Sequence, residues 1–375
     1  MNDRLVAARL ARQVNVRAAM AAAQVEALVL SLGADLPWLT GYEAMPLERP
    51  TVLVVPVDAP ATLVVPRLEA PRVDEEPRLF GLRPWGETDD PVALVAAAVG
   101  GRRRLAVSDR CWASLLLDLQ ATLPGATWRR ASGVTGPLRA VKDDAELASL
   151  AAAGAAADVV SAALLAGDIR LVGRSEAAVS EEIGARLRAE GHVRVNFAIV
   201  GSGPNAASPH HEPGERRIGP GETVVCDFGG TFSLDGDVGY CSDTTRTVVT
   251  GPPEAELAEL YAVLAEAQEA AVQAVRPGVA CEEIDAVGRR RIAEAGFGER
   301  FIHRIGHGIG LEEHEDPYLV EGNGTPIVAG HAFSIEPGIY LSGRLGARIE
   351  DIVVATAGGC RRLNAADRSL HVVDG

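Results

Sequence analysis

Short apolar runs alternate with helical stretches through the first third of the chain. A helical pattern covers about residues 4–24. The runs with the length and β-branched content of strands are EALVLSL (26–32), TVLVVPV (51–57), ATLVVP (61–66) and RLAVSD (104–109). Glycine, proline and aspartate bound these runs, as is typical at strand ends. We therefore expect a small α/β domain over residues 1–135.

A second domain, residues 136–375, follows a segment that glycine and proline loosen, SGVTGPLRAVKDDAE (132–146), where Asp143 or Asp144 can cap a new helix. Helical patterns cover an alanine-rich stretch (145–167) and residues 175–191, about 254–275 and 282–295. The β-type runs are RVNFAIV (194–200), ETVVCDFG (222–229), TTRTVVT (244–250), HAFSIEPGIYL (331–341) and GARIEDIVVAT (346–356). Helices and strands are therefore mixed in this domain.

Acidic residues interrupt the apolar runs of the second domain. Asp227 ends one run, and Asp243 opens the next. Glu336 and Glu350 are each expected inside an apolar strand. A buried carboxylate is costly unless it is paired or bound to a metal. Mutual repulsion would raise the pKa values of these acids unless a cation lies between them.

His307, in IGHGIGL, adds an imidazole to the acids and completes a candidate metal site. Any one of the acids could instead pair with one of the many arginines, but that explanation is weak for all of these positions together. A single ion would leave acids unused, whereas two ions about 3.5–4 Å apart, bridged by carboxylates, would use them all. The oxygen-rich set favours Mn²⁺, with Co²⁺, Zn²⁺ or Fe²⁺ as alternatives.

Composition narrows the remaining classes of function. The formal net charge of −15 argues against a nucleic-acid or anionic-membrane partner. Lys142 is the only lysine, which argues against Schiff-base, P-loop and Ser–Lys chemistry. Five cysteines without a CxxC pair indicate a reducing cytoplasm. We see no signal peptide and no uncharged apolar span of transmembrane length.

Five motifs occur in an order that resembles the pita-bread metallopeptidases, specifically the prolidase and aminopeptidase P branch. They are NAASPHH, CDFGG…GYCSDTTRT, HRIGHGIGLEEHE, FSIEPGIY and GARIEDIVV. The resemblance spans nearly the whole chain and implies an α+β pita-bread catalytic domain. WLTGYE (38–43) is similar to the family's N-terminal α/β domain of the creatinase/prolidase type, which shapes the substrate site and forms a homodimer.

The resemblance also implies a role for each metal-binding candidate. Asp227 would hold one ion, His307 and Glu336 would hold the other, and Asp243 and Glu350 would bridge them. Glu336 would also act as the general base. One spacing departs from the family pattern: Asp227 and Asp243 are sixteen positions apart, about five more than we expect. The longer connection contains Asp237, which is a weaker candidate ligand.

The other implied site residues are histidines and an arginine. His210 and His314 would hold the substrate and stabilise the tetrahedral intermediate, His303 would line the pocket, and Arg348 would position the substrate. His211, Tyr240 and Arg246 could support the site or simply pack. We expect His192, His331 and His371 to be structural or exposed.

The implied function is the hydrolysis of Xaa-Pro bonds in dipeptides or at peptide N-termini by a metal-activated hydroxide. The leaving nitrogen belongs to proline and carries no N–H, so a specialised pocket is needed. The sequence leaves three alternatives to this function open: a metal-free creatinase-like enzyme, a metal-dependent hydrolase or lyase of the same fold that acts on another small molecule, and a non-catalytic peptide-binding module.

Overall fold

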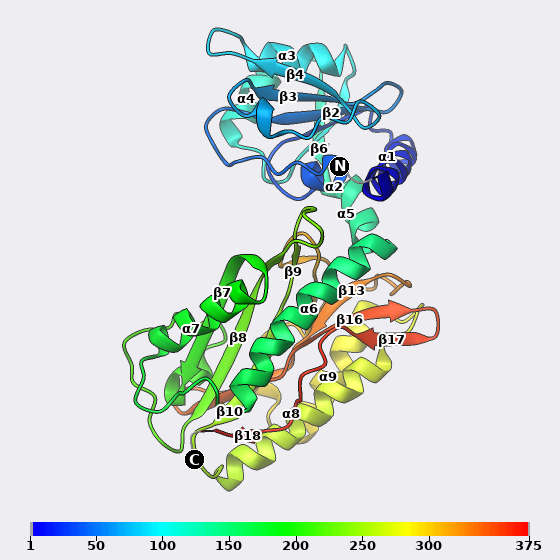
Figure 1. The fold of residues 1–375 in the computed structure, drawn as a ribbon. Coiled ribbons are helices and arrows are strands. Elements are labelled where there is room, and N and C mark those ends of the chain that lie inside the picture. The colour runs from blue at the N-terminus through cyan, green and yellow to red at the C-terminus, as the bar shows by residue number, and fades with distance from the viewer. Residues whose placement is uncertain (1–2, 374–375) are drawn as a thin grey trace. The chain divides into compact units, whose positions relative to one another are not determined.

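The computed structural model describes residues 3–373, which form two compact units that divide between Arg139 and Ala140 (Figure 1). The sequence predicted a boundary after residue 135. The segment there is more regular than expected, because α5 (Ser132–Ala140) is a helix with Pro137 inside it. Pro137 lacks a backbone N–H and therefore removes one hydrogen bond from this helix.

The first unit is built on a sheet with the strand order β4-β3-β2-β1-β5-β6. Its strands are β1 (Ala27–Leu30), β2 (Val52–Pro56), β3 (Thr62–Pro66), β4 (Gly81–Trp85), β5 (Arg104–Val107) and β6 (Thr127–Arg130). Its helices are α1 (Asp3–Ala22), α2 (Asp35–Thr40), the 3₁₀ turn η1 (Ala70–Arg72), α3 (Pro91–Val99) and α4 (Ala113–Thr122). Valines of β1–β3 pack against α3 and α4 to form its core.

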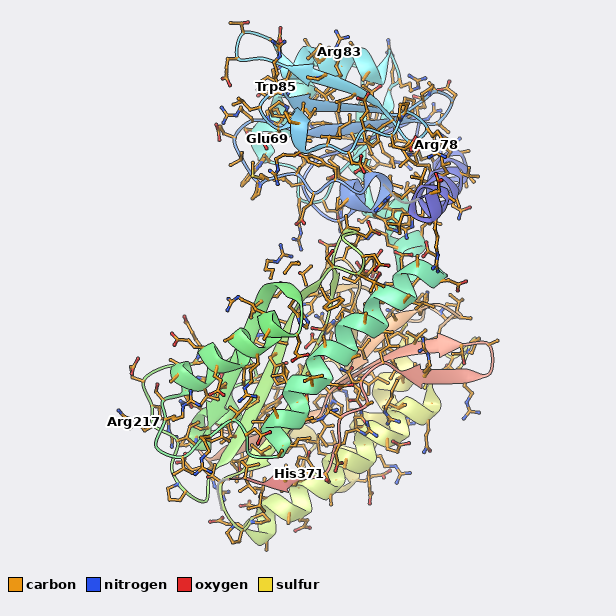
Figure 2. All side chains as sticks on the ribbon, in the orientation of Figure 1. Glu69, Arg78, Arg83, Trp85, Arg217 and His371 are labelled. Atoms are coloured by element: carbon orange, nitrogen blue, oxygen red, sulfur yellow. The ribbon has the colours of Figure 1, made fainter. Side chains whose placement is uncertain are left out.

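The apolar pattern found the inner strands of this unit but not the edges. The runs predicted as strands correspond to β1, β2, β3 and β5, and the predicted first helix is α1. The missed strands, β4 and β6, lie at the two edges of the sheet, where most of their side chains are exposed. Edge strands tolerate arginine and proline, so their sequences carry no apolar run. Trp85 is the buried exception in β4 (Figure 2).

The second unit contains the remaining elements. Its helices are α6 (Asp144–Leu165), α7 (Glu176–Ala189), α8 (Ala255–Ala274) and α9 (Cys281–Glu294), with 3₁₀ turns η2 (Gly203–Ala207) and η3 (Gly298–Arg300). Its strands are β7 (His192–Ser202), β8 (Thr223–Phe232), β9 (Tyr240–Cys241), β10 (Thr244–Val249), β11 (Gly306–Gly308), β12 (Glu315–Leu319), β13 (Ala332–Ile335), β14 (Gly338–Leu341), β15 (Leu345–Arg348), β16 (Asp351–Thr356), β17 (Gly359–Arg362) and β18 (His371–Val372).

Two sheets of this unit carry its helices. The first has the order β18-β10-β8-β7, with β9 paired to β8, and packs against α6 and α7. The second has the order β12-β11-β13-β16-β17 and packs against α8 and α9. β14 and β15 form a separate hairpin. A β-bridge between Thr245 and Glu350 joins the start of β10 to the segment before β16.

Helix α6 begins as the sequence predicted, with Asp143 as its cap. The Asp143 side chain accepts hydrogen bonds from the backbone N–H groups of Ala145 and Glu146, and Glu146 completes a capping box. Helix α6 is long and apolar enough to cross a bilayer by length and composition alone, although Asp158 interrupts its apolar sequence. Its apolar residues instead pack against α7, β7 and β8, as in the core helix of a globular protein.

Candidate active site

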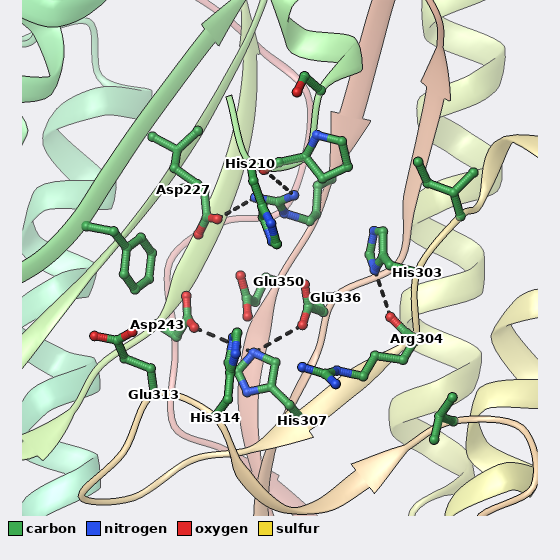
Figure 3. Close-up of a pocket in the computed structure, with 17 residues that line it drawn as sticks. His210, Asp227, Asp243, His303, Arg304, His307, Glu313, His314, Glu336 and Glu350 are labelled. Carbon is green, nitrogen blue, oxygen red and sulfur yellow. Dashed lines mark hydrogen bonds and ion pairs between the residues drawn. The ribbon is translucent and has the colours of Figure 1, made fainter. Parts of the chain in front are cut away.

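A cavity of about 740 Å³ opens in the second unit, between the two sheets (Figure 3). The weaker candidate Asp237 lies outside it, but all of the residues that were assigned a metal or substrate role line it. They are His210, Asp227, Asp243, His303, His307, His314, Glu336, Arg348 and Glu350. Pocket-lining residues that the sequence analysis did not select include Phe197, Ile199, Arg304 and Glu313. The structure therefore brings together residues from positions 197 to 350 at one place.

Asp227 and Asp243 come from neighbouring strands of the first sheet. Asp227 lies within β8, opposite Thr245 of β10, rather than at the end of its strand. Asp243 immediately precedes β10. The chain passes so close to β8 here that a Cβ at Gly229 would lie 2.1 Å from the Ser242 carbonyl oxygen. Glycine at this position therefore lets the longer connection return Asp243 to the cavity.

The strand carrying each glutamate is interrupted, which corrects our expectation that Glu336 and Glu350 lie inside strands. Glu336 lies between β13 and β14, and Glu350 lies between β15 and β16. Pro337 has no N–H to continue the ladder, which accounts for the first break. At the second break, the Glu350 N–H donates to Thr245 O at 3.2 Å. Both glutamates thus lie at a corner directly after a paired strand, and their side chains line the cavity.

His307 occupies the centre of β11 and faces three of the acids. Its Nδ1 is 3.2 Å from Gly308 O, so Nδ1 carries the proton that is donated to this carbonyl. Nε2 points the other way and lies 3.7 Å from Asp243 Oδ2 and 3.1 Å from Glu336 Oε1. Ligand atoms of His307, Asp243 and Glu350 all lie within 4.8 Å of one another. This orientation of Nε2 and this grouping are what a histidine metal ligand requires.

Burial dominates the electrostatics of the acids. Asp243 and Glu350 are 4% and 1% exposed. Burial raises the pKa of Asp243 well above its ordinary value, and the charges of Glu350, Asp227 and Glu336 add to the shift. The pKa of Glu350 is raised well above its ordinary value for the same reasons. Asp227 also has a raised pKa because of its burial, although the paired Arg348 guanidinium opposes this shift.

Glu336 differs from its neighbours in the direction of its pKa shift. Burial acts to raise its pKa, but the hydrogen bond and charge of His307, with the charges of His303 and Arg348, lower it to about 2. The Ser334 hydroxyl also donates to Glu336 Oε1 at 3.1 Å. Glu336 is therefore held as a carboxylate, the form that either a metal ligand or a general base needs.

The unpartnered atoms of the acids show that the donor set suits cations. Within residues 3–373, Asp227 Oδ1, Asp243 Oδ1 and Glu350 Oε1 are buried without a hydrogen-bond partner. Their sister oxygens are better supported: Thr245 donates to Glu350 Oε2 at 2.8 Å, and Arg348 pairs with Asp227 Oδ2. Orphaned carboxylate oxygens in a buried cluster are costly, and divalent cations would satisfy them. The residues present therefore fit a metal centre.

The other histidines reach the cavity from connecting segments. His210 follows η2, and His314 precedes β12; both are exposed. The His314 ring lies 4.0 Å from the His307 ring, centroid to centroid. The His314 residue is exposed as a whole but its ring is partly desolvated, and this desolvation, followed by the charges of His307 and Arg304, lowers the pKa of His314 to about 4, so it is a neutral imidazole at neutral pH. In Figure 3, His210 lies beside Asp227, and His314 lies below it near Asp243.

Tyr340 supports the opposite wall and was missed by the sequence analysis. Arg348 Nη1 donates to the Tyr340 hydroxyl at 3.1 Å, and His303 Nε2 lies 3.0 Å from the same oxygen. His303 Nδ1 donates to Arg304 O, so the Tyr340 hydroxyl donates to Nε2. Burial raises the pKa of Tyr340 to about 12, which keeps this donor protonated. A tyrosine in an apolar strand gives no signal of this role.

Several candidates lie outside the cavity. Asp237 is in the β8–β9 connection and does not line it. The weaker candidates are behind it: His211 binds Glu176, Tyr240 donates to Glu146, and Arg246 donates to the Glu350 carbonyl. The remaining histidines are away from it as well: His192 contacts Ser242, His331 is buried, and His371 pairs with Asp367.

Comparison with known proteins gives matches along nearly the whole chain. Residues 148–357 match the model of metallopeptidase family M24, and residues 12–141 match that of the creatinase/prolidase N-terminal domain. The chain is 45% identical over 360 residues to the probable dipeptidase PepE of Mycobacterium tuberculosis, covering 95% of this chain and 94% of the relative. It is 36% identical to the Xaa-Pro dipeptidase of Lactobacillus helveticus, covering 90% and 92%.

Solved structures give the same picture. The recombinant prolidase from Thermococcus sibiricus superposes with a TM-score of 0.89 at 35% identity, covering 96% of this chain and 98% of that structure. These matches confirm the predicted fold class, a creatinase/prolidase-type N-terminal domain followed by a pita-bread catalytic domain.

Proposed function

Because the chain belongs to metallopeptidase family M24, we propose that it is a metal-dependent Xaa-Pro peptidase that hydrolyses proline-containing dipeptides. The observation that carries the proposal is the buried cluster of orphaned carboxylate oxygens beside His307. It supplies the ligands of a metal centre in a cavity large enough for a small peptide. The alternatives of a metal-free enzyme or a passive binding module leave these costly acids without a purpose.

The metal centre would be held by acids from both sheets and one imidazole. Asp227 would bind one ion, His307 and Glu336 the other, and Asp243 and Glu350 both. Bound divalent ions would supply a water of lowered pKa and a Lewis acid for the carbonyl oxygen. The predominance of oxygen donors favours Mn²⁺, with Co²⁺, Zn²⁺ or Fe²⁺ as alternatives.

The protein's own groups would manage protons and charge around the scissile bond. Glu336, held ionised, would accept a proton as the general base and pass it toward the proline nitrogen. His314 and His210 would donate hydrogen bonds to the substrate as negative charge develops. Arg348 is held by Tyr340 and Asp227, so its guanidinium would have a fixed orientation toward the substrate.

The surroundings of the reaction are also part of the proposal. The pocket walls include Phe197, Ile199 and Ile302, which would provide apolar contact for a proline ring. We propose that the first unit shapes the substrate site and mediates a homodimer, and that the enzyme works in the cytoplasm. The net charge of −15 would disfavour nucleic acid and anionic membranes as partners.

An assay of purified protein combined with metal analysis tests the proposal. We expect two divalent ions per chain and turnover of Ala-Pro when Mn²⁺ is supplied. A parallel assay with Ala-Pro-Ala distinguishes dipeptidase from aminopeptidase action. If neither peptide is cleaved by metal-loaded protein, the proposed function is wrong.

A further inference from the structure

Lys142 is the only lysine of the chain, and it is buried. Its side chain is 1% exposed, and Nζ lies 2.6 Å from Oε1 of Glu315, whose side chain is 7% exposed. The two residues are 173 positions apart in the chain. Neither residue lines the cavity, so the proposed chemistry gives this ion pair no role. A buried pair of charges is not by itself a favourable way to stabilise a fold.

The Lys142 end of the pair is fixed to the body of the second unit. Its backbone N–H donates to Gly330 O at 2.9 Å, and the preceding residue, Val141, forms a β-bridge with His331. The next residue, Asp143, caps α6. Lys142 thus projects from a point where the long helix and the second sheet meet, and this point has little freedom to move.

The Glu315 end belongs to the segment that carries a histidine of the site. Glu315 begins β12 and pairs with Gly308 of β11, next to His307. His314 directly precedes Glu315, and its ring packs on the His307 ring in the cavity (Figure 3). Because His314 and Glu315 are adjacent in the chain, holding Glu315 against Lys142 restrains the backbone that carries His314 into the cavity.

Gly310 shows how closely the local chain is fitted to this pair. A Cβ at this position would lie 2.4 Å from Glu315 Oε1 and 3.2 Å from Lys142 Cε. Gly310, which lies four residues before His314, is thus close against the ion pair. The exposed His314 directly precedes the buried Glu315, so the ion pair anchors the chain immediately beside this histidine.

We propose that Lys142 and Glu315 are positioning residues that hold His314 at the substrate. The proposal rests on the proposed function, because it assumes that His314 hydrogen-bonds the substrate during the reaction. The charged pair acts through His314 and touches neither the substrate nor a metal ligand side chain. A buried ion pair fits this purpose, because a bond between two charges fixes distance and direction more closely than an apolar contact.

Replacing both charges by apolar groups separates positioning from stability. A buried pair can be exchanged for apolar residues of similar volume without unfolding the protein, whereas a single replacement leaves a buried charge unpaired. We therefore choose Lys142→Met combined with Glu315→Leu. For turnover of Ala-Pro, kcat is expected to fall roughly 10- to 100-fold, the range for removing an outer-shell partner, while metal content and melting temperature stay close to wild type.

His314→Asn tests whether the loss acts through the histidine. In the wild-type background it should lower kcat strongly, and in the Lys142→Met/Glu315→Leu background it should add little, because that histidine is already displaced. If the ion pair had only a structural role, the fold decreases in kcat caused by the pair replacement and by His314→Asn would be independent and would multiply. Wild-type kcat in the double variant, or equal effects of His314→Asn in both backgrounds, would overturn the proposal.

A matched control is the ion pair of Arg174 with Glu182, which also lies in the second unit and does not line the cavity. Arg174→Met with Glu182→Leu should leave kcat and KM unchanged. Failure of the wild-type protein to cleave any Xaa-Pro peptide would defeat the proposed function, whereas normal wild-type turnover with an unaffected double variant would defeat only the role of Lys142.

The uniqueness of Lys142 offers a direct check on the pair in solution. An amine-reactive acylating reagent can modify only Lys142 and the N-terminal amine. In the folded wild-type protein, Lys142 should react far more slowly than the N-terminal amine, and Glu315→Gln should increase its rate. Rapid modification of wild-type Lys142 would show that the buried pair is not formed, and the proposal would fail.

Discussion

The acids and the exposed histidines of the site are held in different ways. Asp227 lies within β8, and the backbones next to Asp243 and Glu350 are joined by the Thr245 bridge, so the positions of these acids are fixed by strand pairing. His210 and His314 lie on connecting segments outside the strands and are exposed. The acids thus lie on or beside paired strands in the buried part of the fold, and the histidines lie on exposed connecting segments.

The difference indicates a division of work. Metal ligands must be in place before any ion arrives, and paired strands supply that pre-organisation at the cost of buried, repelling charges. The histidines proposed to contact the substrate would have to let peptides enter and leave, and both lie on connecting segments beside side-chain anchors. His210 is next to His211, which binds the fully buried Glu176, and His314 is next to Glu315.

Asp243→Asn should have the largest effect, because it removes a ligand that strand pairing cannot replace. We expect less than two ions per chain and a loss of activity of roughly 10⁴-fold or more, the scale for losing a group essential to the chemistry. Metal analysis and an Ala-Pro assay measure both. Asp237→Asn is the matched control and should behave as wild type. Full activity in Asp243→Asn would show that Asp243 is not an essential metal ligand, and the proposed metal site would be wrong.

Stripping the metals with a chelator should lower the melting temperature, and more so at higher pH. The folded-state pKa values of Asp243 and Glu350 are raised, so each acid destabilises the folded protein when it is ionised. This loss of folding free energy is absent below the unfolded-state pKa, about 4, and is largest above the folded-state pKa. The gap between metal-loaded and stripped protein should therefore be wide at about pH 8 and narrow toward about pH 5. A gap that widens toward acid would contradict a cost caused by repelling carboxylates.

His314→Asn should weaken catalysis without disturbing the ions. We expect kcat to fall by roughly 10²- to 10³-fold, as for the loss of one hydrogen-bond donor to developing charge, with metal content unchanged. Steady-state kinetics with metal analysis measure this. His371→Asn, distant from the cavity, is the control. Loss of an ion from the His314→Asn protein would contradict this separation, because the exposed histidine would then help to hold the metals.

Glu176→Gln should give the smallest effect, because it weakens an anchor and leaves His210 itself in place. Glu176 accepts hydrogen bonds from Ser202, and with Asn205 and His211 these outweigh burial and lower its pKa. Its stabilisation is therefore present above about pH 4.5 and is lost as the pH falls through the lowered pKa.

We expect kcat/KM of Glu176→Gln to drop roughly tenfold at neutral pH. Its melting temperature should lie below that of wild type, and this difference should shrink in acid. Glu181→Gln, an exposed acid on the same helix, is the control. A difference in melting temperature that grows toward low pH would contradict the anchoring role.

The same comparison explains what could be predicted from sequence. Acids inside apolar runs stand out because burial of a charge is rare, so Asp227, Asp243, Glu336 and Glu350 were all selected, and the structure brings them to one cavity. The breaks at Glu336 and Glu350 were missed, because an apolar run looks the same in sequence whether it forms one continuous strand or two strands with a corner between them.

The anchors of the histidines carried no such signal. Glu176 lies at the start of a charged helix, where an acid is ordinary, and its partners are 26 to 35 residues away. Lys142 was notable only as the sole lysine, and its partner is far along the chain. Contacts of this kind depend on tertiary structure, and neither periodicity nor local motif encodes them.

Helix α6 has a consequence for synthesis of the protein. It is apolar enough to cross a bilayer, and its partners β8, β10 and β16 are all made after it. During synthesis this helix therefore leaves the ribosome before the strands that cover its apolar residues. The last strand of the sheet, β18, which pairs with β10, is completed only at Val372. Until then, the apolar residues of α6 lack their native partners, and such exposed apolar surface favours aggregation of a partly folded chain.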